Sequence, residues 1–217
     1  MRIAVLGGTF NPLHKGHVML AELACEKLGY DRILFVPSYI PPHKIITAKM
    51  TAEDRLEMVR GFCEKEGSGR FLCEVCEIER GGVSYTCDTL EYISEKYKNN
   101  IEGKPGFILG EESAAEFHKW KNPDRIADLA DLVIARRKPG NLAAGVSENT
   151  PKGQFTGDFS RVFNSENFGY PFIELQNPEM KISSSEIRAL IAEGGDWEKY
   201  LPRAVTEYIK GRKLYGY

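Results

Sequence analysis

Short apolar runs alternate along the chain with longer segments whose apolar residues recur at helical spacing. The runs are rich in Val, Ile, Leu and Phe and end near Gly, Pro or charged residues, which is typical of buried strands. We expect strands over residues 2–7, 31–37, 71–79, 106–110, 131–136 and 171–176. Because helical segments separate them, the pattern predicts βα units joined into a mostly parallel sheet.

Helical periodicity follows most of these strands. An amphipathic segment starts at Val18 and keeps its apolar spacing to Leu28, and Gly29 would end it. Further helices are predicted over residues 56–63, 90–97, 113–119, 124–129, 183–192 and 202–210. Each can cover one side of the sheet. The chain therefore predicts an α/β fold with a Rossmann-like, doubly wound sheet and helices on both faces.

The segment 138–170 interrupts this alternation. It is rich in Gly, Asn, Ser and Thr, and its apolar residues follow no steady period. Nothing in it resembles a linker between two cores, and 217 residues suit one domain of the larger kind. We expect a single domain over residues 1–217, with an insertion or mobile loop at 138–170.

The balance of acidic and basic residues limits the kinds of partner that the protein is expected to bind. With 29 basic and 31 acidic residues the formal net charge is −2, so no global field favours nucleic acid or an anionic membrane. Any phosphate site must be local, and macromolecular nucleic acid is not an expected partner. The chain has no long apolar run, and its first residues enter a strand without a signal-peptide pattern. We therefore expect no membrane association and a cytoplasmic location.

Five scattered cysteines make a disulfide framework an unlikely basis for this fold. They are Cys25, Cys63, Cys73, Cys76 and Cys87. The spacing of Cys73 and Cys76 invites a metal or redox interpretation, but no second pair and no nearby histidine accompanies it. Both fall in the expected strand 71–79, where they would point to opposite faces. We favour a structural role for them.

The most informative stretch joins the first strand to the first helix. Residues 7–17 read Gly-Gly-Thr-Phe-Asn-Pro-Leu-His-Lys-Gly-His. Glycines permit close backbone approach to phosphate oxygens, and a helix N-terminus offers unpaired N–H groups there. His14 and His17, three positions apart, add two imidazoles. The stretch matches neither G-x-G-x-x-G nor the P-loop, and a plain glycine-rich turn with one capping histidine is the simpler alternative. The combination favours a phosphate site.

Two further segments carry cations near expected helix or strand ends. Ser183 and Glu186 fit a capping box, so a helix is expected to begin there, and Arg188, a residue type that can bind phosphate bidentately, follows one turn later. An N-cap alone would explain the serines but does not require the arginine. After the second expected strand, a proline-rich loop ends in His43 and Lys44, and Lys44 could reach phosphate oxygens. A solvated loop with a surface lysine is the alternative.

Three more features are compatible with binding but are not specific on their own. Residues 84–90 predict another capped helix start, and Glu111 and Glu112 follow a strand, where they could hold a hydroxyl or a cation. Trp120 stands in a polar run, where it could be a half-exposed core residue or a stacking platform for a flat ring.

Together these residues resemble a known family. The chain is similar to the bacterial nicotinate-nucleotide adenylyltransferases, within the nucleotidyltransferase superfamily that carries H-x-G-H and an I-S-S-T-x-I-R-like segment. These motifs stand here at residues 14–17 and 182–188, and the branch is indicated by residues 41–44, 84–90, 110–120 and 200–209. The resemblance runs almost end to end, and only 138–170 has no clear counterpart.

The resemblance implies transfer of AMP from ATP to nicotinic acid mononucleotide with Mg²⁺, giving deamido-NAD and pyrophosphate. The acceptor's 5′-phosphate would attack the α-phosphorus of ATP in line, so the protein supplies positioning and charge stabilisation. His14 and His17 would steady the α-phosphoryl group, Arg188 would hold the leaving phosphates, and Lys44 would add charge. The ATP-binding residues implied are Gly7, Gly8, Thr9, Phe10, His14, His17, Ile182, Ser183, Ser184, Ser185 and Arg188.

For the acceptor, the resemblance implies that Trp120 stacks on the pyridine ring and that backbone N–H groups near Thr86 and Lys121 receive the nicotinate carboxylate. Lys44 and Glu112 complete the implied mononucleotide contacts. Backbone donors would favour an acid over an amide, because an amide would present its own NH₂ donor to them. Mg²⁺ would be bound mainly through the ATP phosphates.

Three positions depart from the family pattern. Asn11 stands where many superfamily members carry Asp, Glu112 where this family usually carries Asp, and Ser185 where Thr is common. The extra methylene puts the nucleotide contact of Glu112 in doubt. Other hypotheses are a nicotinamide mononucleotide or another phosphate-bearing acceptor and a non-catalytic nucleotide sensor. The remotest is a metal or thiol-redox protein built on Cys73 and Cys76. The sequence does not indicate an oligomeric state.

Overall fold

The computed structural model describes residues 1–42, 50–137, 163, 165–178 and 183–217. Within them lies a six-stranded sheet whose strand order is β3-β2-β1-β4-β5-β6. All of its pairs are parallel. The strands are β1 (Ile3–Gly8), β2 (Arg32–Pro37), β3 (Phe71–Cys73), β4 (Gly106–Gly110), β5 (Asp131–Arg137) and β6 (Phe172–Asn177). This is the order of the doubly wound dinucleotide-binding fold, so the predicted fold class is confirmed.

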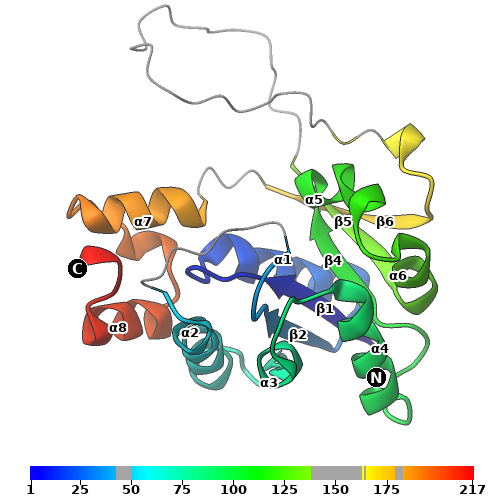
Figure 1. The fold of residues 1–217 in the computed structure, drawn as a ribbon, viewed down its shortest axis with the longest axis horizontal. Helices are drawn as coiled ribbons and strands as arrows, with labels where there is room; N and C mark the ends of the chain where they lie inside the picture. The colour runs from blue at the N-terminus through cyan, green and yellow to red at the C-terminus, as the bar shows by residue number, and fades with distance from the viewer. Residues whose placement is uncertain (43–49, 138–162, 164, 179–182) are drawn as a thin grey trace, which may run out of the picture.

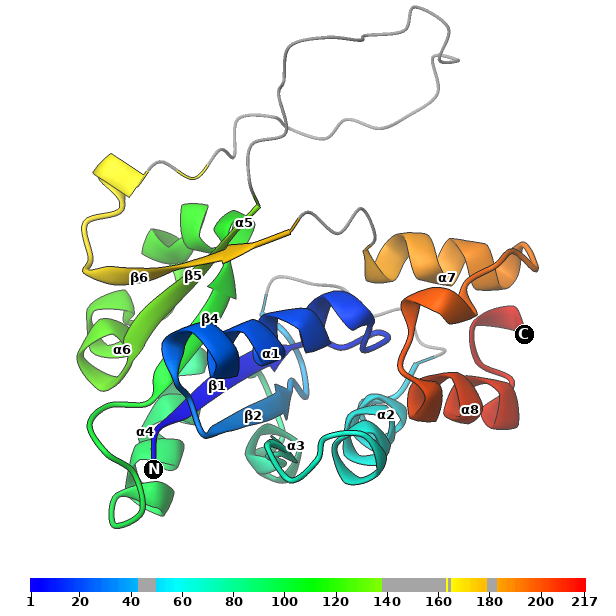
Figure 2. The ribbon, with the colours of Figure 1, turned by 180° about the vertical axis from the view of Figure 1, so that it is seen from behind.

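The sheet is a central layer between two helical layers (Figures 1 and 2). Alternate residues of β1 enter different cores, since Ala4 and Leu6 face one and Ile3 and Val5 face the other. The first core is completed by α1 (Lys15–Leu28), α2 (Ala52–Lys65), α7 (Ser184–Ala192) and α8 (Arg203–Arg212). The second is completed by α3 (Cys76–Arg80), α4 (Thr86–Tyr97), α5 (Glu111–Ala115) and α6 (Pro123–Leu129). Burial on both faces explains why the strands read as continuous apolar runs.

Short 3-10 helices complete the described elements. They are η1 (Phe117–Lys119), η2 (Ser165–Asn167), η3 (Glu198–Tyr200) and η4 (Leu214–Gly216). Most of the segment 138–170, which we expected to be an insertion or mobile loop, lies outside the described residues. Its last part packs on the second core: Phe163 is buried, and the rings of Phe168 and Tyr170 lie 5.5 and 5.3 Å from that of Phe117.

Two boundaries differ from the sequence prediction. The expected strand 71–79 is wrong beyond Cys73, because β3 ends there and Cys76 begins α3. The two cysteines therefore do not alternate on one strand. The first helix begins at Lys15 rather than Val18, because His14 and His17 form its capping box. A histidine pair at these positions is not an obvious helix start in a sequence.

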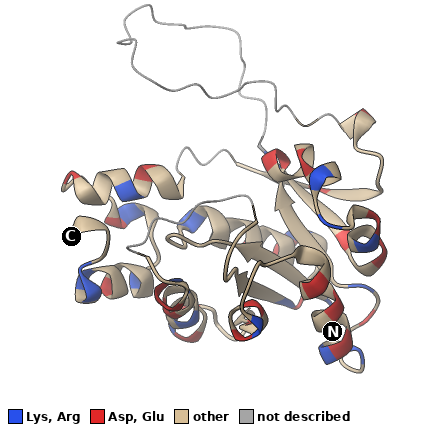
Figure 3. Ribbon diagram, viewed as in Figure 1, with Lys and Arg blue, Asp and Glu red and all other residues tan. Residues whose placement is uncertain are grey.

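Positive and negative residues are interspersed along the helices (Figure 3). No helix in the described part of the chain is long and apolar enough to span a bilayer. The strand order reverses between β1 and β4, and in such sheets ligands bind outside the carboxyl ends of the strands at this point. We therefore expect the ligand-binding residues in the loops that follow β1 and β4.

Candidate active site

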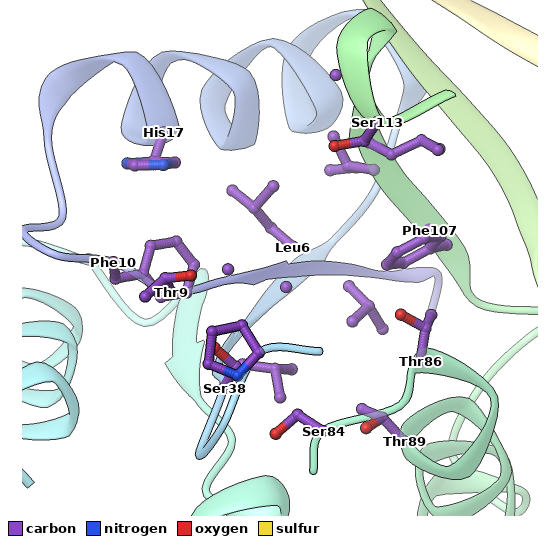
Figure 4. Close-up of a pocket in the computed structure, with 18 of the residues that line it drawn as sticks. Leu6, Thr9, Phe10, His17, Ser38, Ser84, Thr86, Thr89, Phe107 and Ser113 are labelled. Carbon is purple, nitrogen blue, oxygen red and sulfur yellow. The ribbon is translucent and has the colours of Figure 1, made fainter. Parts of the chain in front are cut away.

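A cleft of about 910 Å³ opens over the carboxyl ends of β1 and β4. Its walls come from the β1–α1 loop and the start of α1, the end of β2, the start of α4, the Trp120 region and the start of α7. The His17 side chain points from α1 into this cleft, opposite Ser84, Thr86 and Thr89 (Figure 4). The cleft thus joins segments that are far apart in the sequence.

The two histidines are held by the first turn of α1. The Gly16 N–H donates to Nδ1 of His14 (3.1 Å), and the His14 N–H donates to Nδ1 of His17 (3.2 Å). Their ring centroids lie 3.8 Å apart, and Phe10 packs edge-on against His17. A ring whose Nδ1 accepts a hydrogen bond carries its proton on Nε2. The capping role suggested by the simpler alternative is thus real, and it also fixes which edge of each imidazole is a donor.

The β1–α1 loop is compact. A Cβ on Gly8 would lie 3.0 Å from the ring of Phe10, so any side chain here would force that ring to shift. Phe10 itself has a φ of 47°, in the left-handed region, and its ring is almost fully buried. Burial of the ring compensates for a backbone conformation that L-residues rarely adopt. The loop therefore has one well-defined path past the cleft.

The start of α7 is joined to this loop from the other side. Ser183 and Glu186 form the predicted capping box. Arg188 donates to the Asn11 carbonyl (2.8 Å) and to Oγ of Ser185 (3.1 Å), and Ser184 donates to the Pro12 carbonyl (3.1 Å). The guanidinium and the helix N-terminus therefore lie beside the histidine turn, an arrangement suited to a chain of phosphates.

The opposite wall combines a helix start with aromatic rings. The predicted helix start at Thr86 is present, but the predicted cap is not, because the N-cap residue is Tyr85 and no side chain caps α4. Trp120 lines the cleft with its ring 6.0 Å from that of Phe107 and 5.5 Å from that of Phe117. An uncapped helix start beside a half-buried indole can receive an anionic group attached to a flat ring.

Lys121 follows the tryptophan and makes an ion pair across the wall. Its Nζ lies 3.1 and 3.2 Å from the two carboxylate oxygens of Asp88 and 4.4 Å above the ring of Tyr85. Burial alone would raise the pKa of Asp88, but hydrogen bonds from Cys87 and Lys121 hold that pKa below its usual value. The pair links the Trp120 segment to the first turn of α4.

The structure brings most of the predicted site residues together. Those lining the cleft are Gly7, Gly8, Thr9, Phe10, His14, His17, Thr86, Trp120, Lys121, Ser183, Ser184, Ser185 and Arg188. Lys44 and Ile182 lie outside the described residues. Glu112 is exposed in the first turn of α5 and is not among the lining residues, whereas its neighbour Ser113 is. The mononucleotide contact of Glu112 stays a prediction.

Three residues near the cleft were not anticipated from the sequence. Glu77 lay hidden in a segment interpreted as strand, and Tyr215 belongs to the chain's last turn. Arg55 is fully buried on α2. A signal for Arg55 exists, since it shares a helical stripe with Met58, Val59 and Phe62, all of them buried. A charged residue on an apolar stripe indicates a specific polar contact.

Glu77 is a buried carboxylate in the wall of the cleft. Its Oε1 accepts a hydrogen bond from the Thr89 hydroxyl (2.6 Å), and the Ser84 hydroxyl is a second donor to it. Burial raises the pKa of Glu77, although these two hydrogen bonds and nearby arginines oppose the shift. Its donors are side chains of the same wall, so it serves to order that wall.

The described residues offer no ready-made metal centre. No group of three or more His, Cys, Asp or Glu side chains in that part of the chain could hold an ion. Cys73 and Cys76 are free thiols, and burial raises the pKa of each to about 12. Both are absent from the lining of the cleft.

Known proteins match this chain over nearly its whole length. Residues 5–190 fit the cytidylyltransferase-like family. A protein of Treponema pallidum, named as a probable nicotinate-nucleotide adenylyltransferase, is 34% identical over 215 residues, which are 99% of each chain. A Geobacter protein of the same name is 34% identical over 218 residues, which cover 99% of this chain and 98% of the relative.

The chain belongs to the nicotinate-nucleotide adenylyltransferase family. The fold agrees, because the nicotinic acid mononucleotide adenylyltransferase of Plasmodium falciparum complexed with NaAD superposes with a TM-score of 0.71. That structure is 19% identical and covers 99% of this chain and 97% of its own. In this adenylyltransferase-family chain, the histidine turn and the start of α7 line the same cleft.

Proposed function

We propose that this chain transfers AMP from ATP to nicotinic acid mononucleotide, giving deamido-NAD and pyrophosphate in NAD biosynthesis. The observation that carries the proposal is the convergence of the His14–His17 capping box with Arg188 and the α7 N-terminus on one cleft. Family membership at 34% identity over the full chain supports the same reaction.

The ATP side supplies charge at fixed positions. The acceptor's phosphate attacks the α-phosphorus in line, and negative charge redistributes over the α-phosphoryl oxygens. His14 and His17 donate Nε2–H bonds to these oxygens. Arg188, with backbone N–H groups of Ser184 and Ser185, receives the β- and γ-phosphates as pyrophosphate leaves. Preorganised donors of this kind need no rearrangement during the reaction. Lys44 is assigned a supporting charge on sequence grounds alone.

The acceptor side selects the mononucleotide. Trp120 stacks on the pyridine ring, and backbone N–H groups of Thr86 and Lys121 receive the nicotinate carboxylate. The uncapped start of α4 supports this assignment, because its first N–H groups lack a capping side chain. An amide would set its own NH₂ donor against these donors, which favours the acid.

Mg²⁺ fits this site as an ion that enters with ATP. The described lining offers hydroxyls and histidines whose Nδ1 atoms already accept hydrogen bonds, rather than a cluster of carboxylates. Mg²⁺ commonly binds through substrate phosphates and water. When bound it would neutralise charge on the phosphates. The cytoplasm stays the expected location.

The deciding experiment is an assay of pyrophosphate release by the purified protein. ATP is supplied with either nicotinic acid mononucleotide or nicotinamide mononucleotide, and turnover is expected with a clear preference for the acid. Absence of turnover with both acceptors contradicts the proposed function. Preference for the amide contradicts only the assigned specificity.

A further inference from the structure

Arg55 occupies an unusual position directly behind the cleft. It lies on α2, has an exposed fraction of 0% and ranks among the largest fully buried side chains of the described residues. Burying a guanidinium costs several kcal/mol unless its hydrogen bonds are made. An apolar residue would fill the stripe of α2 at less cost. The arginine therefore serves a purpose other than packing.

Its hydrogen bonds go to two separate loops. Nη1 donates to the Thr9 carbonyl (2.9 Å) in the β1–α1 loop and to the Ser38 carbonyl (2.5 Å) after β2, and Nη2 donates to the Tyr39 carbonyl (2.9 Å). Both Thr9 and Ser38 line the cleft. One rigid, planar group thus fixes the spacing between the loop that carries the histidines and the segment that follows β2.

No carboxylate pairs with Arg55 among the described residues. Its Nε atom has no hydrogen-bond partner there, its other donors go to three backbone carbonyls, and Tyr215 and Glu77 lie close enough to act on its charge. A lone ion pair would have been a simpler way to bury the arginine. Because its three acceptors are backbone carbonyls, Arg55 holds the loops themselves rather than a particular side chain.

The segment held by Arg55 continues to the acceptor wall. The Tyr39 N–H donates to Oγ of Ser84 (2.9 Å), and the Ser84 N–H donates to the Ile40 carbonyl (2.8 Å). Ser84 stands just before α4 and its hydroxyl also bonds Glu77. Polar contacts therefore run without a break from the histidine loop through Arg55 and Tyr39 to the start of α4.

We propose that Arg55 is a positioning residue for adenylyl transfer, which holds the β1–α1 loop and the Ser38–Tyr39 segment at the separation that aligns the acceptor phosphate with the α-phosphorus. It acts through backbone carbonyls and does not touch substrate. The inference rests on the proposed function. A misplacement of about 1 Å between reacting groups costs on the order of 100-fold in rate.

The test compares Arg55→Met and Arg55→Lys with Met58→Ala. Met58 is buried one turn further along α2, does not line the cleft and provides a control for loss of stability. At a temperature well below every melting transition, we expect kcat to fall about 100-fold in Arg55→Met and about 10-fold in Arg55→Lys. Lysine keeps the charge but cannot reach three acceptors at once. KM for each substrate should change less, and Met58→Ala should keep the wild-type kcat.

Amide hydrogen exchange supplies a readout that does not depend on turnover. The amides of residues 9–11 and 38–40 should exchange faster in Arg55→Lys than in the wild type, and Met58→Ala should leave them unchanged. A folded Arg55→Lys with wild-type kcat and exchange overturns the proposal. Equal loss of kcat in Met58→Ala and Arg55→Met overturns it too. Lack of turnover in the wild type contradicts the proposed function instead, while the exchange result still tests how the loops are held.

Discussion

The two walls of the cleft are built in different ways. The wall proposed to bind ATP, here called the ATP wall, consists of the β1–α1 loop and the start of α7. It is held by hydrogen bonds from side chains to backbone carbonyls: Arg55 to Thr9, Arg188 to Asn11 and Ser184 to Pro12. The acceptor wall has a buried polar cluster of its own in Glu77, Ser84 and Thr89, but the residues proposed to bind the acceptor lie nearer the surface. Lys121 and Asp88 form an exposed pair, whose side chains are 43% and 36% accessible, and Trp120 is half-buried. The binding residues of one wall are thus tied to backbone carbonyls, and those of the other rely on surface contacts.

This difference matches what each wall is proposed to do. Charge moves on the α-phosphoryl group, so donors there must already be in place when it does. Recognition of a flat acid needs a stacking surface and two N–H groups, and these tolerate small displacements. We therefore expect substitutions in the ATP wall to lower kcat and substitutions in the acceptor wall to raise KM.

Removal of the His17 donor should have the largest effect. His17→Asn keeps an acceptor near the position of Nδ1, so the cap on the His14 N–H can persist while the Nε2–H donor is lost. We expect kcat to fall by about two to three orders of magnitude, the range for loss of one preorganised donor. Steady-state pyrophosphate release measures this fall in kcat.

Two further variants accompany His17→Asn. His17→Ala removes the donor and the cap together and should lose stability as well as kcat. His118→Ala changes an exposed histidine on η1 that does not line the cleft, and its kcat should match the wild type. Near-normal turnover in His17→Asn would contradict the role proposed for this histidine.

Loss of the stacking surface should come next. Trp120→Ala is expected to raise KM for the mononucleotide by about 5- to 150-fold with a smaller change in kcat, because stacking on an aromatic ring is worth about 1–3 kcal/mol before and during reaction. KM for ATP should stay near its wild-type value. Trp197→Phe offers a control at a buried tryptophan outside the cleft lining. A defect confined to ATP would show that Trp120 belongs to the other wall.

The chain's last turn provides a milder test of the ATP wall. The Tyr215 hydroxyl donates to Oδ1 of Asn11 (2.8 Å), and burial raises the pKa of Tyr215, so it remains a donor at neutral pH. Tyr215→Phe keeps the ring but loses a bond worth about 1 kcal/mol, so kcat should fall up to about fivefold. Tyr217→Phe, at an exposed ring, should change nothing. An increase in KM for the mononucleotide with an unchanged kcat would place Tyr215 functionally on the acceptor side.

The sequence predicts local motifs better than it predicts the buried residues that hold those motifs in place. The strand at 106–110, the capping box of Ser183 and the turn at residues 7–17 follow from neighbours in sequence, and the structure confirms each of these elements. Arg55 could not be placed this way, because its partners are carbonyl oxygens 16 to 46 positions away and carry no side-chain signal.

Two other differences from the sequence prediction involve side-chain contacts. Directly after the strand ends at Cys73, the Glu74 carboxylate accepts hydrogen bonds from Lys96 and Tyr97. The histidine capping box lies outside the usual Ser, Thr, Asp and Asn code for helix starts. In both cases a side chain that looks ordinary in sequence takes a partner that periodicity does not reveal.

The smallest effect is expected where the acceptor wall relies on its surface ion pair. Lys121→Met removes the charge that bonds Asp88 but keeps the backbone N–H proposed to receive the carboxylate. Exposed pairs contribute little, so KM for the mononucleotide should rise less than about fivefold and kcat should not change. The wild-type KM should rise with ionic strength more than that of the variant, since salt screens exposed charges. A loss of kcat as large as that of His17→Asn would show that both walls are equally intolerant of displacement, and the contrast between them would fail.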